Sequence, residues 1–332
     1  MRMQAHNPES RWPQGRPAIR KRLGLGLSLL ALCSASVAMG LRVEPSVAAC
    51  GAPVAAPAVP PHAALHRLAD SQAVRGQKDL QWVWLGSPTS RYPHTALGSP
   101  VHAGSLHALV AGPTGAVREV VYPLPLHRVF EDRVPRLADL DGDGRDEIIV
   151  VESDAIRGAA LVVLGLRAHA PTDAARDQPF APVLLERARS PYTGAPFRWL
   201  NPVGVADFDG DGRLDIASVT TPHIGGVLTL HRFRPPVLEP YAKAMDVSNH
   251  RMGALEQSLA AIVEAPGHRP TVIVPDMQLR ALHALRWEAP GQWRELADPK
   301  PLQARVERLS AAPGGACALL ADGSWWRMML SP

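Results

Sequence analysis

One acidic loop occurs twice in this sequence, and this repeat limits the folds that the chain can adopt. Residues 135–154 read PRLADLDGDGRDEIIVVESD, and residues 204–222 read GVADFDGDGRLDIASVTTP. When Asp139 is placed over Asp207, the alternating carboxylates and glycines of the two loops align one for one. Each loop runs into an apolar β-like segment, and a Gly turn and a second β-like segment follow. The repeat therefore predicts two β-hairpins, each with an acidic loop at its entry.

Pairs of β-like segments recur more weakly along the rest of the chain, so that about five related units are expected. The segment pairs are 81–85 with 105–111, 148–151 with 159–166, 216–219 with 227–233, 271–274 with 281–287, and 316–320 with 325–330. The 33 prolines argue against a mainly helical fold, and 252–263 is the only stretch with a weak helical pattern. Sheets repeated in this way favour a β-propeller with its termini brought together, and a β-solenoid or a split sandwich is the alternative.

The two loops carry the ligands that calcium prefers. Ca²⁺ takes six to eight oxygen ligands in flexible geometry, and the glycines let alternate carboxylates converge. Mg²⁺ is disfavoured because it prefers rigid octahedral sites, and zinc because no Cys or His lies nearby. We expect two calcium ions, each held by three Asp side chains, an Arg backbone carbonyl and a closing carboxylate. The predicted ligands are Asp139, Asp141, Asp143, Arg145 and Glu147 in the first loop, and Asp207, Asp209, Asp211, Arg213 and Asp215 in the second.

Two other interpretations of the loops are less consistent with the sequence. A single loop could be an acidic surface turn, since Asp-Gly is a common turn former, but two matched copies favour a metal site. Without an ion, converging carboxylates repel and raise one another's pKa. An EF-hand needs a Glu at loop position twelve and flanking helices. Those positions hold Val150 and Ser218, both within β-like segments.

The loops resemble those of the FG-GAP/VCBS repeat family, whose calcium loops lie in the blades of propellers such as the integrin α head. The resemblance implies an all-β propeller of about five blades in which structural calcium stiffens individual blades. The chain also looks like exported bacterial VCBS-repeat proteins, which implies no activity. It departs from the family in having no Phe-Gly pair, although Gly194-Ala195-Pro196 occurs. The weak copy at 263–271 offers only Glu264 as a carboxylate, so no ion is expected there.

The first residues have the pattern of an export signal. Arg20, Lys21 and Arg22 end a basic stretch, and an uncharged apolar run extends from Leu23 to Gly40. Small residues before position 39 predict cleavage after Ala38. The expected organisation is a signal peptide at 1–38, an Ala/Pro-rich linker at 39–64, and a propeller domain at 65–332 with calcium loops at 135–154 and 203–222. We expect a periplasmic or secreted protein without a membrane span after cleavage.

Two alternatives to a cleaved signal remain open, and both concern membrane attachment. The apolar run is just long enough to serve as an uncleaved anchor. Residues 47–50 (VAAC) resemble a lipobox, which would make Cys50 a lipid carrier. Cys50 and Cys317 could instead form a disulfide in an oxidising compartment, or remain a mobile thiol and a buried strand thiol.

The charge of the processed chain excludes a nucleic-acid partner. Residues 1–38 hold six of the 35 basic side chains and one of the 31 acidic ones, so 29 basic and 30 acidic side chains remain. The basic isoelectric point of the whole chain therefore comes from the leader.

Two functions from different classes are consistent with these features. The sequence has no HExxH, GxxxxGK[ST], GxGxxG or GxSxG motif. This favours a non-catalytic binding or scaffold module for a protein or glycan ligand. The alternative is a propeller enzyme that acts on an extracytoplasmic glycan or lipid. A deep central pocket that holds paired carboxylates, or a His–carboxylate pair away from the acidic loops, would favour it. Polar loop residues at 91–94 and 248–251 are candidates to line a central pocket, whereas Trp199, Trp287, Trp325 and Trp326 are expected to pack between strands.

Overall fold

The computed structural model describes residues 40–46, 50, 66–112, 115–167, 181–288 and 291–331. These residues form strands, turns and irregular segments and contain no helix, so none of them lies in a helix that could cross a membrane. They all belong to one compact unit that runs from Ala38 to Pro332. The all-β class is confirmed for this part of the chain. The predictions for the signal peptide, for the lipobox residues 47–49 and for residues 51–64 of the linker lie outside it.

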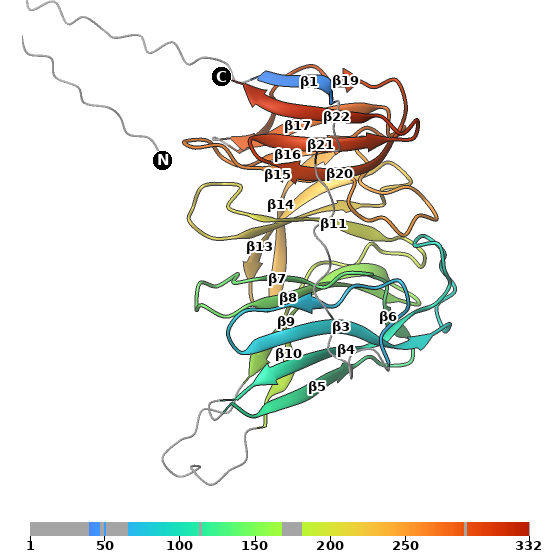
Figure 1. Ribbon diagram of the computed structural model, residues 1–332. Coiled ribbons are helices and arrows are strands. Elements are labelled where there is room, and N and C mark those ends of the chain that lie inside the picture. The colour runs from blue at the N-terminus through green and yellow to red at the C-terminus, as the bar shows by residue number, and fades with distance from the viewer. Residues whose placement is uncertain are drawn as a thin grey trace, which may run out of the picture. The chain divides into compact units, whose positions relative to one another are not determined.

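Most strands pair into five groups of four antiparallel strands, which we number in the order of their inner strands (Figure 1). Group 1 contains β2 (Val74–Arg75), β3 (Leu80–Thr89), β4 (His102–Ala111) and β5 (Val117–Pro123). Group 2 contains β7 (Arg136–Ala138), β8 (Glu147–Asp154), β9 (Gly158–Arg167) and β10 (Val183–Arg189). Group 3 contains β11 (Leu200–Ala206), β12 (Asp215–Thr220), β13 (Val227–Arg234) and β14 (Val237–Met245).

The last two groups follow the same pattern. Group 4 contains β15 (Ala261–Val263), β16 (Thr271–Pro275), β17 (Ala281–Glu288) and β18 (Gln292–Glu295). Group 5 contains β20 (Val306–Ala312), β21 (Gly315–Leu320), β22 (Trp325–Ser331) and β1 (Gly40–Ser46). Two short strands lie outside the groups: β6 (Arg128–Phe130) pairs with β4 and β8, and β19 (Lys300–Pro301) pairs with β17.

Hydrophobic side chains pack consecutive groups against each other. One cluster joins groups 1 and 2 through residues such as Leu106 and Ile148, and a second joins groups 2 and 3 around Trp199. A third cluster, around Phe208, joins groups 3 and 4, and a fourth joins groups 4 and 5. The fourth cluster also takes in Leu41 of β1. Burial of apolar surface therefore links the groups in the order in which they follow in the chain.

The burial of a strand depends on its place within the group. Every residue of β8 is buried, because other groups cover both faces of this inner strand. The outer strands β5 and β14 expose most of their residues and contact the core only at intervals. The inner strands accordingly read as continuous apolar runs in the sequence, and the outer strands do not.

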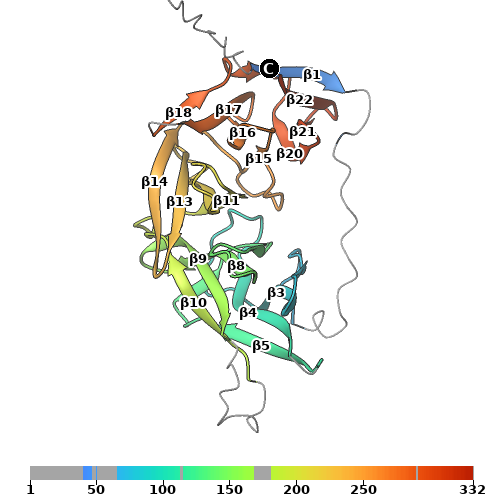
Figure 2. The same ribbon diagram turned by 90° about the vertical axis from the view of Figure 1, so that its left-hand side faces the viewer.

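Strand β1 brings the start of the described chain to its end. It pairs antiparallel with β22 over seven residues, from Gly40 opposite Ser331 to Ser46 opposite Trp325, and the two strands lie side by side in both views (Figures 1 and 2). Part of the segment expected as a linker at 39–64 is thus an edge strand of group 5. Its alternation of Leu41 and Val43 with polar residues is short, and only pairing with β22 makes it a strand.

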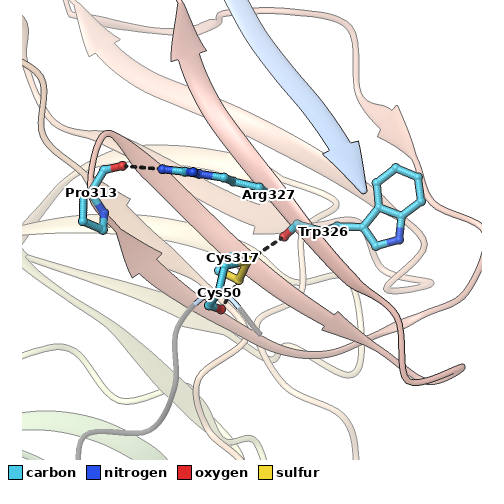
Figure 3. The surroundings of a disulfide bond; sticks show 5 residues. All are labelled: Cys50, Pro313, Cys317, Trp326 and Arg327. Atoms are coloured by element: carbon cyan, nitrogen blue, oxygen red, sulfur yellow. Dashed lines mark hydrogen bonds between the residues drawn. A yellow bond between two sulfur atoms is a disulfide. The ribbon is translucent and has the colours of Figure 1, made fainter. Parts of the chain in front are cut away.

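A disulfide fixes this connection just beyond β1. Cys50 and Cys317, which is fully buried in β21, are bonded with their Cα atoms 5.6 Å apart (Figure 3). The bond closes a loop of 267 residues. A sulfur in this bond cannot also carry a lipid, so the disulfide and the lipoprotein interpretation of Cys50 exclude each other.

The five predicted segment pairs all coincide with neighbouring strands of the structure. They fall on β3–β4, β8–β9, β12–β13, β16–β17 and β21–β22. The weak helical interpretation of 252–263 is wrong: only Ala261–Val263 is regular, as strand β15. Contacts with other parts of the fold override the local pattern, since the N–H of Gly253 donates to the Ala96 carbonyl at 2.8 Å.

Candidate metal centres and a histidine cluster

The first acidic loop connects β7 to β8, and its own carboxylates hold its backbone. The Gly144 N–H donates to Asp139 Oδ2 at 2.8 Å, and the Asp143 N–H donates to Asp141 Oδ1 at 3.1 Å. The Arg145 N–H donates to Asp143 Oδ1 at 2.8 Å. The loop is therefore curled around its side chains, as the alternation of Asp and Gly predicts.

The second loop connects β11 to β12 and repeats these hydrogen bonds at the aligned positions. The Gly212 N–H donates to Asp207 Oδ2 at 2.9 Å, and the Asp211 N–H donates to Asp209 Oδ1 at 3.1 Å. The Arg213 N–H donates to Asp211 Oδ1 at 2.9 Å. The sequence alignment of the two loops thus extends to their atoms.

The glycines of the loops have matching left-handed backbone angles. The φ angles are 75° at Gly142 and 84° at Gly144, against 73° at Gly210 and 84° at Gly212. Residues with a Cβ rarely adopt such angles, so glycine is needed at these positions for the curled conformation.

Three carboxylates come together in each loop. Within each set, one oxygen of every residue lies within 4.8 Å of the others, a spacing that could hold a metal ion. The two sets are Asp139, Asp141 and Glu147 in the first loop, and Asp207, Asp209 and Asp211 in the second.

The other predicted ligands lie near these sets without belonging to them. Asp143 and Arg145 are both exposed in the first loop. Arg213, which aligns with Arg145, is exposed in the second loop. Asp215 is buried and accepts a hydrogen bond from the Tyr241 hydroxyl at 2.6 Å. The proposed roles of the two Arg carbonyls, and of Asp143 and Asp215, stay predictions.

Glu147 closes the first set from a buried position. It is 2 % exposed, and its Oε2 accepts the Leu140 N–H at 2.9 Å. Burial, with a smaller contribution from the Asp141 carboxylate, raises the pKa of Glu147 to about 7, although the Leu140 N–H and Arg187 lower it. A divalent cation among these oxygens would favour the ionised form, because opposite charge lowers a carboxyl pKa.

Asp215 has the same electrostatic environment in the second loop. Burial, with a smaller contribution from the Asp209 carboxylate, raises the pKa of Asp215 to about 7, although the Tyr241 hydrogen bond and Arg232 lower it. Both loops therefore hold a buried carboxyl whose negative charge the protein compensates only in part.

One carboxylate oxygen in the first loop has no hydrogen-bond partner among the described residues. Asp139 Oδ1 is buried and has no hydrogen-bond partner, whereas the Oδ2 atom of the same carboxylate binds the Gly144 N–H. Buried carboxylate oxygens are normally paired with a donor or a cation. The residues thus fit a hard cation at this point, because the residue with the unpaired oxygen belongs to the set of three carboxylates.

Arginines from other strands balance part of the negative charge. Arg187 of β10 binds Asp141 Oδ2 at 2.9 Å and Glu147 Oε1 at 3.2 Å. Arg232 of β13 binds Asp209 Oδ2 through its Nε at 3.2 Å. The arginines supply no metal ligand, so each set still offers only oxygen ligands, which favours calcium over zinc.

The corresponding loop of group 4 differs from the acidic loops. It runs from 264 to 270 between β15 and β16, and Glu264 with Arg269 lines a cavity of about 670 Å³ that also borders Asp207 of the second loop. Arg269 donates to the Trp287 carbonyl at 3.4 Å. The prediction that this loop binds no ion stays a prediction.

A histidine–carboxylate pair lies away from both acidic loops. His94 Nδ1 lies 2.5 Å from Glu131 Oε1, and the Ser153 hydroxyl donates to Glu131 Oε2 at 2.5 Å. Glu131 is fully buried, and the His94 side chain is 12 % exposed. Since Glu131 accepts from Nδ1, this nitrogen carries the proton, and Nε2 of His94 makes no hydrogen bond within the described residues.

Two further histidines lie near this pair. His250 Nε2 donates to the Ala254 carbonyl at 3.0 Å, so its Nδ1 accepts from His223 Nε2 at 2.9 Å. Burial lowers the pKa of His223 to about 4 and that of His250 to about 3, so both rings are neutral at pH 7. The ring of Trp199 stacks on His223 with centroids 6.0 Å apart.

Sequence reasoning found only part of this cluster. It selected the segments that contain His94 and His250 but not Glu131 or His223, which no motif marks. Asn249 behaves as a structural residue: its Nδ2 donates to the Asn201 carbonyl at 3.0 Å. Only the folded chain brings these loops of groups 1, 2 and 3 together.

Three of the four tryptophans have the packing role that was expected, and the fourth, Trp325, is partly buried in β22. Trp199 is 2 % exposed within the cluster between groups 2 and 3, and its Nε1 donates to the Glu131 carbonyl at 2.9 Å. Trp287 and Trp326 are partly buried against the clusters that involve groups 4 and 5.

Comparison with known proteins adds no relative. No family model matches this chain. No curated protein matches it either.

Proposed function

We propose that the protein is an exported β-propeller of the FG-GAP/VCBS type, which holds two structural calcium ions and acts as a non-catalytic binding or scaffold module. The observation that carries the proposal is the pair of acidic loops, which share carboxylate positions, backbone hydrogen bonds and left-handed glycines. Surface turns have no need to share the same carboxylate positions, whereas two binding sites for the same metal ion require the same ligands in the same places. The unpaired Asp139 Oδ1 adds an acceptor that a cation would satisfy.

The arrangement of the strands supports the propeller. Five groups of four antiparallel strands pack in chain order through apolar clusters, and β1 supplies the outer strand of group 5. Such a closing strand joins the first and last parts of a ring of sheets. The disulfide between Cys50 and Cys317 strengthens the same connection and suits an oxidising compartment outside the cytoplasm.

Calcium stabilises this fold by joining carboxylates that otherwise repel. In the first set it would replace repulsion among Asp139, Asp141 and Glu147 with ligand bonds, and so tie the entry of β8 to the end of β7. Extracellular modules bind calcium at about 10⁻⁴ to 10⁻³ M, so the ions would act as constant parts of the structure.

Thermal unfolding with and without calcium tests this proposal. At a calcium concentration ten times the dissociation constant, which 1 mM reaches for a site of about 10⁻⁴ M, each site adds roughly 1.4 kcal/mol to the free energy of unfolding. We expect the unfolding temperature to rise in millimolar calcium and the rise to disappear in the double variant Asp141→Ala, Asp209→Ala. An equal unfolding temperature in calcium and in chelator would contradict the proposal.

One observation favours a second candidate function, that of a propeller enzyme. The His94–Glu131 pair has the geometry of a general acid–base dyad, with Nε2 of His94 free for proton transfer. Its test is hydrolysis of chromogenic glycosides and esters, with His94→Asn as the matched variant. Activity that the variant loses would favour the enzyme over the binding module, and no activity in either protein would favour the binding module.

A further inference from the structure

A cavity with a mainly apolar lining lies between groups 2 and 3, apart from both acidic loops. It has a volume of about 280 Å³ and is bordered by residues 190–193, which follow β10, and by one face of β12, β13 and β14. Ligand sites for drug-sized molecules begin at about 300 Å³, so this cavity suits a ligand of the size of one sugar.

The polar residues of the cavity come from neighbouring positions in the sheet. Thr229 of β13 pairs with Ser218 of β12 on one side and with Lys243 of β14 on the other. His231 lies two residues beyond Thr229 and therefore on the same face of β13. Leu228 and Leu230, on the opposite face, pack in the apolar cluster with group 4. The alternation in β13 thus turns a polar face toward group 2.

Several of these polar groups lack a partner within the described residues. Thr229 is 4 % exposed, and its hydroxyl makes no hydrogen bond there. His231 is 5 % exposed; its Nε2 contacts the Ser218 hydroxyl at 3.1 Å, but its Nδ1 is buried and unpaired. Buried polar groups are normally satisfied, so the buried, unpaired His231 Nδ1 points to a ligand in this cavity.

The charge of the cavity identifies the chemical class of that ligand. Lys243 is exposed at its edge and pairs with no carboxylate in the described part of the chain. No acidic residue lines the cavity. An ammonium group with hydroxyl and imidazole groups suits an oxyanion that also carries hydroxyls.

We infer that this cavity binds a small hydroxylated anion, a sugar acid or a sugar phosphate, through Lys243, Thr229 and His231. The inference rests on the proposed role as a binding module and names the chemistry of one ligand. The Lys243 ammonium contacts the carboxylate or phosphate, while Thr229 and the unpaired His231 nitrogen bond to hydroxyl or anionic oxygens. The apolar side chains of Leu200 and Val227 complete the wall for the sugar carbons.

Protection of Lys243 from acetylation provides a direct test on the full-length protein. Acetic anhydride labelling, read by mass spectrometry, compares Lys243 with Lys300 in the same sample. The probes are galacturonate, glucose 6-phosphate and inorganic phosphate, with galactose and glucose as neutral controls. We expect at least one sugar anion to slow acetylation of Lys243 about fivefold or more at saturation, with no change at Lys300. Whether galacturonate or glucose 6-phosphate protects distinguishes a carboxylate from a phosphate ligand, and inorganic phosphate alone reports the anion without a sugar.

Calorimetric titration of variants with the protecting anion completes the test. Lys243→Met should weaken binding about tenfold or more, because it removes a charge-assisted hydrogen bond, and Thr229→Val should weaken it less. Lys300→Met is the matched control and should bind as the wild type does. Since Lys243 is exposed, its replacement should leave the unfolding temperature unchanged, so a loss of binding would not reflect misfolding.

Three results would overturn the inference: no protection of Lys243 by any of the anions, equal protection by the neutral sugars, or unchanged binding in Lys243→Met. Calcium titration of the same sample separates this test from that of the proposed function. Two bound calcium ions without anion binding would refute only the cavity. Anion binding without calcium would refute only the metal sites.

Discussion

Loss of the Cys50–Cys317 disulfide should strongly destabilise the fold. The bond closes a loop of 267 residues, and the chain-entropy relation for a loop of that length gives about 5.6 kcal/mol at 25 °C as an upper value. For a protein of this size, 1 kcal/mol corresponds to about 2–4 °C in unfolding temperature. The variant Cys50→Ser should therefore unfold about 10–20 °C below the wild type. Cys317 stays as a small buried side chain in β21, so its packing is preserved.

The assay is thermal unfolding followed by circular dichroism, with and without dithiothreitol. Reduced wild type should unfold at the temperature of Cys50→Ser, and the reductant should not affect the variant. A wild type whose unfolding temperature changes by less than about 2 °C on reduction would refute the reasoning. It would mean that the seven residue pairs of β1 with β22 hold the first and last strands together without the bond.

Two further predictions concern the acidic loops and the buried core beside them. In chelator, Glu147 and Asp215 hold their protons more tightly in the folded chain than in the unfolded one, because burial raises their pKa. Their contribution to stability is therefore complete below the unfolded pKa values and is lost as the pH rises through about 7. Calcium must displace these protons, so the difference in unfolding temperature between calcium and chelator should grow from pH 5 to pH 8; a constant difference would exclude such coupling. Phe208→Ala, at a fully buried side chain within the second loop, should cost about 3–5 kcal/mol in urea unfolding, whereas the control Phe197→Ala, at a side chain 49 % exposed, should cost far less. Equal losses would show that Phe208 does not anchor the loop.

The inner strands and the acidic loops could be predicted from the sequence for a physical reason. The strands β8 and β9 are buried over nearly their whole length, so their apolar runs carry the signal of a strand. The acidic loops have left-handed backbone angles at their glycines, so the alternation of Asp and Gly in the sequence predicts the curled conformation of the loops. Local chemistry determines both features.

The parts that sequence reasoning missed depend on distant contacts. The outer strand β5 exposes most of its residues and becomes a strand by pairing with β4. Strand β1 lies in the segment that was expected to be a linker, and it becomes a strand by pairing with β22 at the other end of the chain. The stretch 252–263 has a weak helical pattern, yet its backbone bonds to another loop. No local pattern reports such pairings.

The same limit applies to the candidate sites. Glu131 and His94 are separated by 37 residues, and only folding places them 2.5 Å apart. The cavity residue His231 lies in a segment that reads as an ordinary apolar strand, and its unpaired nitrogen is visible only in the fold. Asp215 aligns with Glu147 in sequence, but Tyr241 from β14 binds it and separates it from the second carboxylate set.

The number of calcium ions bound per chain tests the central claim most directly. Isothermal titration of the chelator-stripped protein should give two ions for the wild type. It should give one ion for Asp141→Ala and one for Asp209→Ala, because each change removes a carboxylate from only one set. The double variant should bind none. A wild type that binds no calcium, or two ions that persist in the double variant, would contradict the assignment of the acidic loops as metal sites.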